Sequence, residues 1–132
     1  MRIQDIMSHS PVVCGENETV DAAVKLMWDH GCSAVPVVKE DGRIAGIVTD
    51  LGIGMATYMK GKSFEEVPVK DAMTLRVLSC RLGDLLESVE RVMRDNQVRR
   101  LQVLDNEDRL VGVVSFSDVV RHTYTKAYGD GT

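Results

Sequence analysis

The sequence predicts a mixed α/β (α+β) fold in which two β-α-β-β-α units pack through their sheets about a pseudo-twofold axis. One observation is an internal repeat: the sequence matches itself without a gap when it is shifted by 66 residues. The other is that both repeats show the same order of two kinds of segment: apolar segments typical of strands, and segments whose apolar residues recur at helical spacing. A repeat of about 54 residues buries little core alone, so we expect the two units to cover each other's sheets.

The repeat rests on identical residues at matched positions. They are Asp5 and Asp71, Met7 and Met73, Cys14 and Cys80, Met27 and Met93, Val37 and Val103, and Gly46 and Gly112. From this match we place the first unit at residues 1–56, a polar linker at 57–68, the second unit at 69–122 and a tail at 123–132.

The elements of each repeat follow in a fixed order, beginning with a turn and a brief extended segment at residues 11–13 or 77–79. A helix is expected next, because apolar residues recur at i, i+3, i+4 and i+7 in the first repeat. These residues are Val20, Ala23, Val24 and Met27, with Leu86, Val89 and Met93 on the corresponding face of the second repeat. Residues 84–87 resemble a capping box that opens the second helix.

Two apolar strands separated by a polar turn complete the sheet of each repeat. They are predicted at residues 34–38 and 44–48 in the first repeat, and at 101–104 and 110–114 in the second. Each repeat then closes with a short helix that begins near Asp50 or Ser117.

The composition indicates a globular protein of the cytoplasm. Of 132 residues, 44% are apolar and 27% are charged, and the net charge of −4 disfavours a nucleic-acid binder. No apolar run approaches the ~20 residues that span a bilayer, so no membrane partner is expected. The first residues lack the pattern of a signal peptide, and three cysteines fit reduced thiols better than disulfides.

The sequence contains no recognisable catalytic or metal-binding set. His9, His30 and His122 do not share metal-ligand spacing, and no CxxC, HExxH, P-loop or GxSxG motif is present. We therefore expect no metal site and no enzyme activity. Cys14 and Cys80 are matched positions, and the interpretation as small buried apolar residues is favoured over a redox role.

Residues 112–118 contain the side chains best suited to bind a ligand. In this segment the last strand of the second repeat is followed by a helix. Ser115 and the free N–H groups of the helix can contact a phosphate, and Asp118 can accept bonds from two sugar hydroxyls. The alternative is that a serine caps the helix and Asp118 is an ordinary acid of its first turn. The residues alone leave both interpretations open.

Arg99 and Arg100 precede the middle strand of the second repeat. Neighbouring strand residues point to opposite faces, so one arginine at most is expected in a given cleft, where it would suit a phosphate or carboxylate. The alternative is a pair of solvated surface arginines.

The duplication, the Asp-x-Met at each start, and the segments at 35–38 (Val-Pro-Val-Val) and 46–49 (Gly-Ile-Val-Thr) resemble a tandem pair of CBS domains, a Bateman module. The resemblance covers about residues 1–122. It implies binding of an adenosyl ligand, such as AMP, ADP, ATP or S-adenosylmethionine, in the cleft between the units. It also implies a regulatory rather than catalytic role and a tendency to dimerise.

Matching the family pattern position by position gives a set of ligand-binding residues in the second repeat. The resemblance suggests Asp118 for the ribose hydroxyls, Ser115 in the same motif, and Arg100 for a phosphate. It places the adenine near an entry segment and a second segment before the middle strand. The full set is Thr74, Leu78, Ser79, Val98, Arg99, Arg100, Ser115 and Asp118.

Both repeats also depart from the family pattern. The first has Gly52 where the ribose aspartate would stand and Cys32-Ser33-Ala34 in place of the arginine segment, so its cleft is expected to be weak or vacant. The second has Gln102 where the first has Pro36, which we expect to affect strand geometry more than chemistry.

The leading hypothesis is a stand-alone regulatory module that senses an adenosyl ligand, requires no cofactor, forms a homodimer and signals to an effector protein. The alternative is a structural or protein-interaction module with a vestigial ligand site. The sequence does not choose among AMP, ADP, ATP, S-adenosylmethionine and NAD, because all share the adenosine that the matched residues would hold.

Overall fold

The computed structural model describes residues 2–129, and the chain divides into two compact units. The middle unit is Val12–Val77; the split unit combines the chain up to Pro11 with the chain from Leu78 onward. The repeats and the compact units therefore divide the chain at different places. The leading segment of each repeat belongs to the unit that holds the strands and helices of the other repeat.

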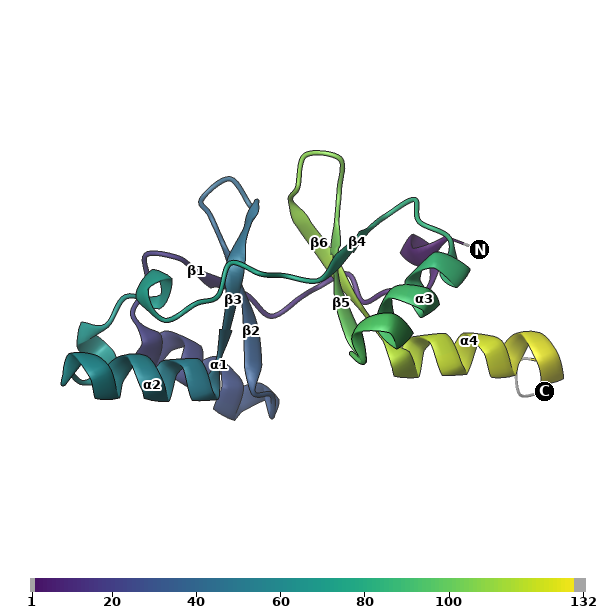
Figure 1. Cartoon of the computed structure of the whole chain (residues 1–132). Helices are drawn as coiled ribbons and strands as arrows, with labels where there is room; N and C mark the ends of the chain where they lie inside the picture. The colour runs from purple at the N-terminus through teal and green to yellow at the C-terminus, as the bar shows by residue number, and fades with distance from the viewer. Residues whose placement is uncertain (1, 130–132) are drawn as a thin grey trace. The chain divides into compact units, whose positions relative to one another are not determined.

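The middle unit contains a three-stranded sheet and two α-helices (Figure 1). Strand β1 runs parallel to β2, and β2 runs antiparallel to β3, in the order β1-β2-β3. Its elements are β1 (Cys14–Gly15), α1 (Val20–His30), β2 (Ala34–Val38), β3 (Ile44–Thr49), α2 (Asp50–Lys60), and the 3-10 turns η2 (Phe64–Glu66) and η3 (Val69–Asp71).

The split unit repeats this plan with the sheet order β4-β5-β6. Strands β4 and β5 are parallel, and β5 and β6 are antiparallel. Its elements are the 3-10 turn η1 (Ile3–Asp5), β4 (Ser79–Arg81), α3 (Leu86–Asn96), β5 (Arg100–Leu104), β6 (Leu110–Ser115) and α4 (Phe116–Tyr128). The mixed α/β class and the order of elements predicted from the sequence are confirmed.

Each unit has a hydrophobic core of its own between its sheet and its helices. In the middle unit, Val20, Ala23 and Met27 of α1 pack in one cluster with Val35 and Val48 of the sheet. The helical spacing predicted this face of α1 correctly. In the split unit the matched cluster contains Val89, Met93, Leu101, Val103 and Val114.

Several boundaries differ from the predictions. The first strand of each repeat lies at Cys14–Gly15 and Ser79–Arg81, later than residues 11–13 and 77–79. The predicted capping box at 84–87 is wrong: Leu85 is the N-cap without a side-chain bond, and the Asp84 carboxylate instead accepts from the Arg81 N–H at 2.9 Å. Helix α4 continues to Tyr128, beyond residue 122, and residues 130–132 lie outside the described part of the chain.

The matched glycines Gly46 and Gly112 have a steric explanation. The Ile47 N–H and carbonyl pair with Thr74 at 2.9 Å each, and Ser8 pairs in the same way with Val113 at 2.8 and 3.0 Å. These bridges press a second stretch of backbone against the strand. A Cβ atom on Gly46 would lie 2.5 Å from the Thr74 carbonyl oxygen, and one on Gly112 would lie 2.5 Å from that of Ser8. Only glycine fits such close backbone approaches.

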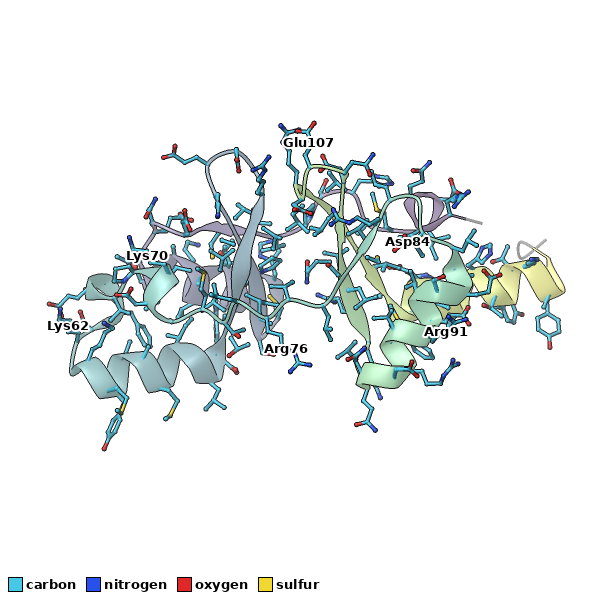
Figure 2. The ribbon with its side chains drawn as sticks, turned by 45° about the horizontal axis from the view of Figure 1, so that its top comes forward. Lys62, Lys70, Arg76, Asp84, Arg91 and Glu107 are labelled. Atoms are coloured by element: carbon cyan, nitrogen blue, oxygen red, sulfur yellow. The ribbon has the colours of Figure 1, made fainter. Side chains whose placement is uncertain are left out.

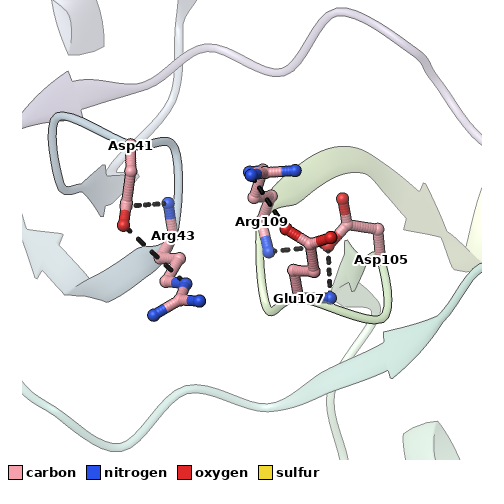
Figure 3. A network of polar contacts seen from close by, with 5 residues as sticks. All are labelled: Asp41, Arg43, Asp105, Glu107 and Arg109. Atoms are coloured by element: carbon pink, nitrogen blue, oxygen red, sulfur yellow. Dashed lines mark hydrogen bonds and ion pairs between the residues drawn. The ribbon is translucent and has the colours of Figure 1, made fainter.

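The hairpin turns of the two sheets are held by short-range polar contacts (Figure 3). The Asp105 carboxylate accepts from the backbone N–H groups of Glu107 at 2.8 Å and Arg109 at 3.0 Å. These bonds, that of Arg109 first, lower the pKa of Asp105. In the β2–β3 turn, Asp41 accepts from the Arg43 N–H at 3.0 Å.

Charged side chains are exposed on the surface of both units. Figure 2 shows Lys62 and Lys70 in the segment that follows α2 and Glu107 at the tip of the β5–β6 turn. Among residues 2–129, no helix is both long and apolar enough to cross a membrane.

Candidate ligand site

The junction of β6 and α4 is organised by a reciprocal capping box. The Ser115 hydroxyl accepts from the Asp118 N–H at 3.1 Å, and the Asp118 Oδ2 accepts from the Ser115 N–H at 2.9 Å. The prediction that a serine caps this helix is therefore confirmed for Ser115. Capping fixes the Asp118 side chain at the first turn of α4, where the positive end of the helix dipole favours an anion.

The other carboxylate oxygen of Asp118 is paired with a surface arginine. Arg121 Nη2 lies 2.5 Å from Asp118 Oδ1, and the Arg121 side chain is 73% exposed while that of Asp118 is 16% exposed. An ion pair with such an exposed partner is worth only about 0–1 kcal/mol. A ligand hydroxyl can therefore replace Arg121 on Oδ1 while Oδ2 keeps its place in the cap.

The two arginines of the second repeat lie beside this junction. The Arg99 carbonyl accepts from the Phe116 N–H at 2.7 Å. Arg100 begins β5 as the register partner of Ser115, so the two side chains share one face of the sheet. Neither arginine forms an ion pair within the described part of the chain. The structure thus brings together Arg99, Arg100, Ser115 and Asp118.

The remaining predicted residues occupy three different environments. Leu78 and Ser79 lie beside β5, where the Leu78 carbonyl accepts from the Gln102 N–H at 3.4 Å and Ser79 is the register partner of Gln102. Val98 packs against the split-unit core and lines a groove between α3 and α4. Thr74 belongs to the middle unit, where it pairs with Ile47, whereas the other predicted residues belong to the split unit.

The matched junction in the middle unit lies between β3 and α2. It keeps the side-chain cap, from Thr49, but has no acid at the position matched to Asp118. The Thr49 hydroxyl accepts from the Gly52 N–H at 3.0 Å, as Ser115 does from Asp118. Gly52 offers no carboxylate, and a Cβ there would lie 3.1 Å from both the Ala72 carbonyl oxygen and the Thr49 hydroxyl. The Asp50 carboxylate is turned to the Leu51 N–H at 2.7 Å. The two junctions are chemically unequal.

The matched cysteines are structural. Cys14 and Cys80 are buried, each in the core of its own unit. Burial raises the pKa of Cys14 to about 11 and that of Cys80 to about 12, with smaller contributions from Glu18 and Asp84. Both thiols are protonated near neutral pH, and thiols in that state are weak nucleophiles. No metal-binding cluster of His, Cys, Asp or Glu occurs among residues 2–129.

Two features of the split unit were not anticipated from the sequence. Gln102 is buried in β5 and its Oε1 has no hydrogen-bond partner. A groove of about 990 Å³ runs between α3 and α4 and is lined by Phe116, Tyr124 and Tyr128 among others. The only sequence signal for Gln102 was its replacement of the matched proline, and the groove depended on how far α4 extends.

The aromatic side chains lie outside both cores. All six are at least 43% exposed, and none belongs to either buried cluster: Trp28, Tyr58, Phe64, Phe116, Tyr124 and Tyr128. Three of them, Phe116, Tyr124 and Tyr128, line the groove between α3 and α4. Exposed aromatic side chains on one surface are typical of surfaces that contact a partner.

Known proteins resemble the chain over most of its length. A curated relative, the CBS domain-containing protein YhcV of Bacillus subtilis (strain 168), is 32% identical over 117 residues, which cover 89% of this chain and 81% of that protein. Two other curated relatives are much longer, and the chain spans only 28% and 23% of their lengths.

Solved structures share the fold. The CBS domain pair of MJ0100, in complex with 5′-methylthioadenosine and S-adenosyl-L-methionine, matches with a TM-score of 0.74 and 25% identity, covering 96% of this chain and 98% of the other. CBSX2 in complex with AMP matches with a TM-score of 0.80 and 26% identity, with the same coverage. The CBS domain family model matches residues 3–53 and 69–124, the two repeats found in the sequence. The chain therefore belongs to the CBS domain family, as a pair of CBS domains.

Proposed function

We propose that this protein is a regulatory module that binds one adenosyl ligand at the β6–α4 junction of the split unit. The observation that carries the proposal is the Asp118 carboxylate, fixed by the cap at one oxygen and held at the other only by an exposed arginine. The adenosyl compounds named with MJ0100 and CBSX2 support this class of ligand.

Each residue of the junction has a role in this proposal. Asp118 accepts hydrogen bonds from the ribose hydroxyls after Arg121 moves away from Oδ1. Ser115 and the Ser117 N–H face the 5′ substituent, and Arg100, the register partner of Ser115, supplies positive charge to its phosphates. Leu78, Ser79 and the backbone at Val98 contact the base.

The regulatory mechanism follows from differential binding. A ligand that binds one conformation more tightly shifts the population toward it, and an effector protein that contacts that conformation receives the signal. Nothing in this mechanism needs catalysis or a bound cofactor. The buried, protonated thiols fit the cytoplasmic location that we propose.

Thermal unfolding combined with titration calorimetry tests the proposal. AMP, ADP, ATP, S-adenosylmethionine and NAD, which all contain adenosine, are compared with GMP. At least one adenosyl ligand is expected to raise the unfolding midpoint, by an amount equivalent to about 2.7 kcal/mol at a hundredfold excess over its dissociation constant. The stoichiometry is expected to be one per chain, because Gly52 provides no ribose acid. No shift with any adenosyl ligand at millimolar concentration would contradict the proposal.

A second candidate function, a protein-interaction module, is favoured by the exposed aromatic side chains. We propose that the α3–α4 groove is covered by a second copy of the chain, which gives the homodimer expected from the family. The groove rim carries both charge signs, with Glu90 and Arg94 one turn apart on α3. A two-fold pairing can place each acid of one copy against a base of the other.

The dimer is tested by replacing Tyr124 and Tyr128 with serine together. Their rings are 5.0 Å apart and exposed, so little folding energy depends on them, whereas a dimer would lose two aromatic anchors. Sedimentation velocity is expected to show dimer for the native chain and monomer for the double variant. Leu75→Ser, at another exposed apolar residue, serves as the control and should remain dimeric. A native chain that sediments as monomer would contradict this proposal.

A further inference from the structure

Among residues 2–129, Gln102 is the only buried polar residue, and only 5% of its surface is exposed. Its Oε1 is buried and accepts no hydrogen bond. Buried polar atoms almost always have partners, because leaving one unpaired keeps the full cost of removing it from water. An unpaired amide in the middle of a strand therefore needs a specific explanation.

The sheet pattern shows which face carries this amide. Leu101 and Val103, on either side of Gln102, pack in the split-unit core. Gln102 therefore projects from the opposite face, which it shares with its register partners Ser79 and Val113. Its own N–H donates to the Leu78 carbonyl. Of the residues that we propose as neighbours of the base, Ser79 shares this face with the amide.

The first repeat shows that the fold does not need an amide here. The matched residue in β2 is Pro36, which has an apolar side chain and serves the same place in a sheet of the same order. An apolar residue at position 102 would remove the cost of the unpaired oxygen. The amide therefore occurs in the second repeat, which also has Asp118 at its strand-to-helix junction, and is absent from the first.

We propose that the Gln102 side chain is a specificity-determining contact that recognises the base of the ligand as a 6-aminopurine. This inference rests on the proposed function. The Oε1 accepts from the exocyclic N6 amino group, and the Nε2 donates to the ring nitrogen N7. A glutamine amide matches the donor and acceptor pattern of adenine in this way. The contact depends on the base alone, so it serves AMP and S-adenosylmethionine alike.

Discrimination follows from the cost of the unpaired oxygen. A purine without the amino group leaves Oε1 unpaired in the complex, and a 6-oxo purine places an acceptor against it. Sites that hydrogen-bond a ligand group reject the analogue that lacks it, because the buried partner is then left without a bond.

The first experiment uses the native chain and no substitution. Titration calorimetry compares AMP with purine riboside 5′-monophosphate, which lacks only the amino group, and with IMP, which carries oxygen in its place. AMP is expected to bind about tenfold more tightly than either analogue. Equal affinity for AMP and purine riboside 5′-monophosphate, or tighter binding of IMP, would overturn the inference while leaving the proposed function intact.

The second experiment uses Gln102→Leu and Gln102→Asn. In both variants AMP affinity is expected to fall to that of purine riboside 5′-monophosphate, whose own affinity is unchanged. The unfolding midpoint of free Gln102→Leu should not decrease, because the unpaired amide is gone. Gln4→Leu, on the exposed η1 turn, is the control and should keep the preference for AMP.

The outcomes separate the two proposals. A preference for AMP that survives in Gln102→Leu overturns the role of Gln102 alone. If no adenosyl ligand, S-adenosylmethionine included, binds the native chain at millimolar concentration, both the role of Gln102 and the proposed function are overturned. If Gln102→Leu and Gln102→Asn do not fold, the comparison of AMP, purine riboside 5′-monophosphate and IMP on the native chain still tests the role of Gln102.

Discussion

Asp118→Asn is expected to weaken the binding of AMP about thirtyfold, equivalent to ~2 kcal/mol, because hydrogen bonds to a charged group are the strong ones. The asparagine carbonyl oxygen can still accept from the Ser115 N–H, so the cap is retained. The ion pair with Arg121 is exposed and contributes little to folding. Titration calorimetry with AMP measures the effect, and the unfolding midpoint without ligand is expected to change by only a few degrees.

The matched control is Asp50→Asn in the first repeat. Asp50 is also an acid at a strand-to-helix junction, but its carboxylate bonds the Leu51 N–H and its unit has Gly52 in place of the ribose acid. AMP affinity should be unaffected. Unchanged affinity in Asp118→Asn itself, with the midpoint preserved, would remove Asp118 from the site.

Gly112→Ala is expected to destabilise the protein by about 3 kcal/mol, the upper part of the range for overpacking. The new Cβ would lie 2.5 Å from the Ser8 carbonyl oxygen and 2.8 Å from the Met7 sulfur. Ser8 can move only by giving up its two backbone hydrogen bonds to Val113. Differential scanning calorimetry should show the midpoint falling by roughly 10 °C.

Two alanine variants calibrate this effect. Gly46→Ala places its Cβ 2.5 Å from the Thr74 carbonyl oxygen and should lower the midpoint similarly. Gly83→Ala has no atom within 4 Å of the new Cβ and should leave the midpoint nearly unchanged. If Gly112→Ala behaved like Gly83→Ala, the bridge between Ser8 and Val113 would not contribute to folding as the geometry indicates.

The parts of the fold that the sequence predicted depend on repeated or periodic residues. The buried face of α1 follows from Val20, Ala23 and Met27 at helical spacing. The matched Gly46 and Gly112 identified the repeat, whereas their close backbone contacts are seen only in the structure. The predicted cap at Asp84 failed because this carboxylate has a competing donor, the Arg81 N–H, in the preceding turn. Local patterns do not show which of two nearby donors an acid will bind.

The candidate site was predictable where its residues are close in sequence. Ser115 and Asp118 are in contact through the capping box, and Arg100 is the register partner of Ser115. Arg121 was missed, although it lies one helical turn after Asp118. Gln102 was interpreted as a matter of strand geometry, because its importance depends on burial and on an absent hydrogen bond, and neither property is visible in the sequence.

The division of the chain between the two units sets an order for folding during synthesis. Val12–Val77 is one continuous stretch, so the middle unit has all of its residues before β4 is made. The residues up to Pro11 leave the ribosome before the middle unit, yet Val113, the partner of Ser8, is made after a hundred further residues. Closing that long loop adds an entropic cost that the middle unit does not have. Once Val77 has left the ribosome, we expect a stalled nascent chain to resist proteases within residues 12–77 while residues 2–11 are still cut.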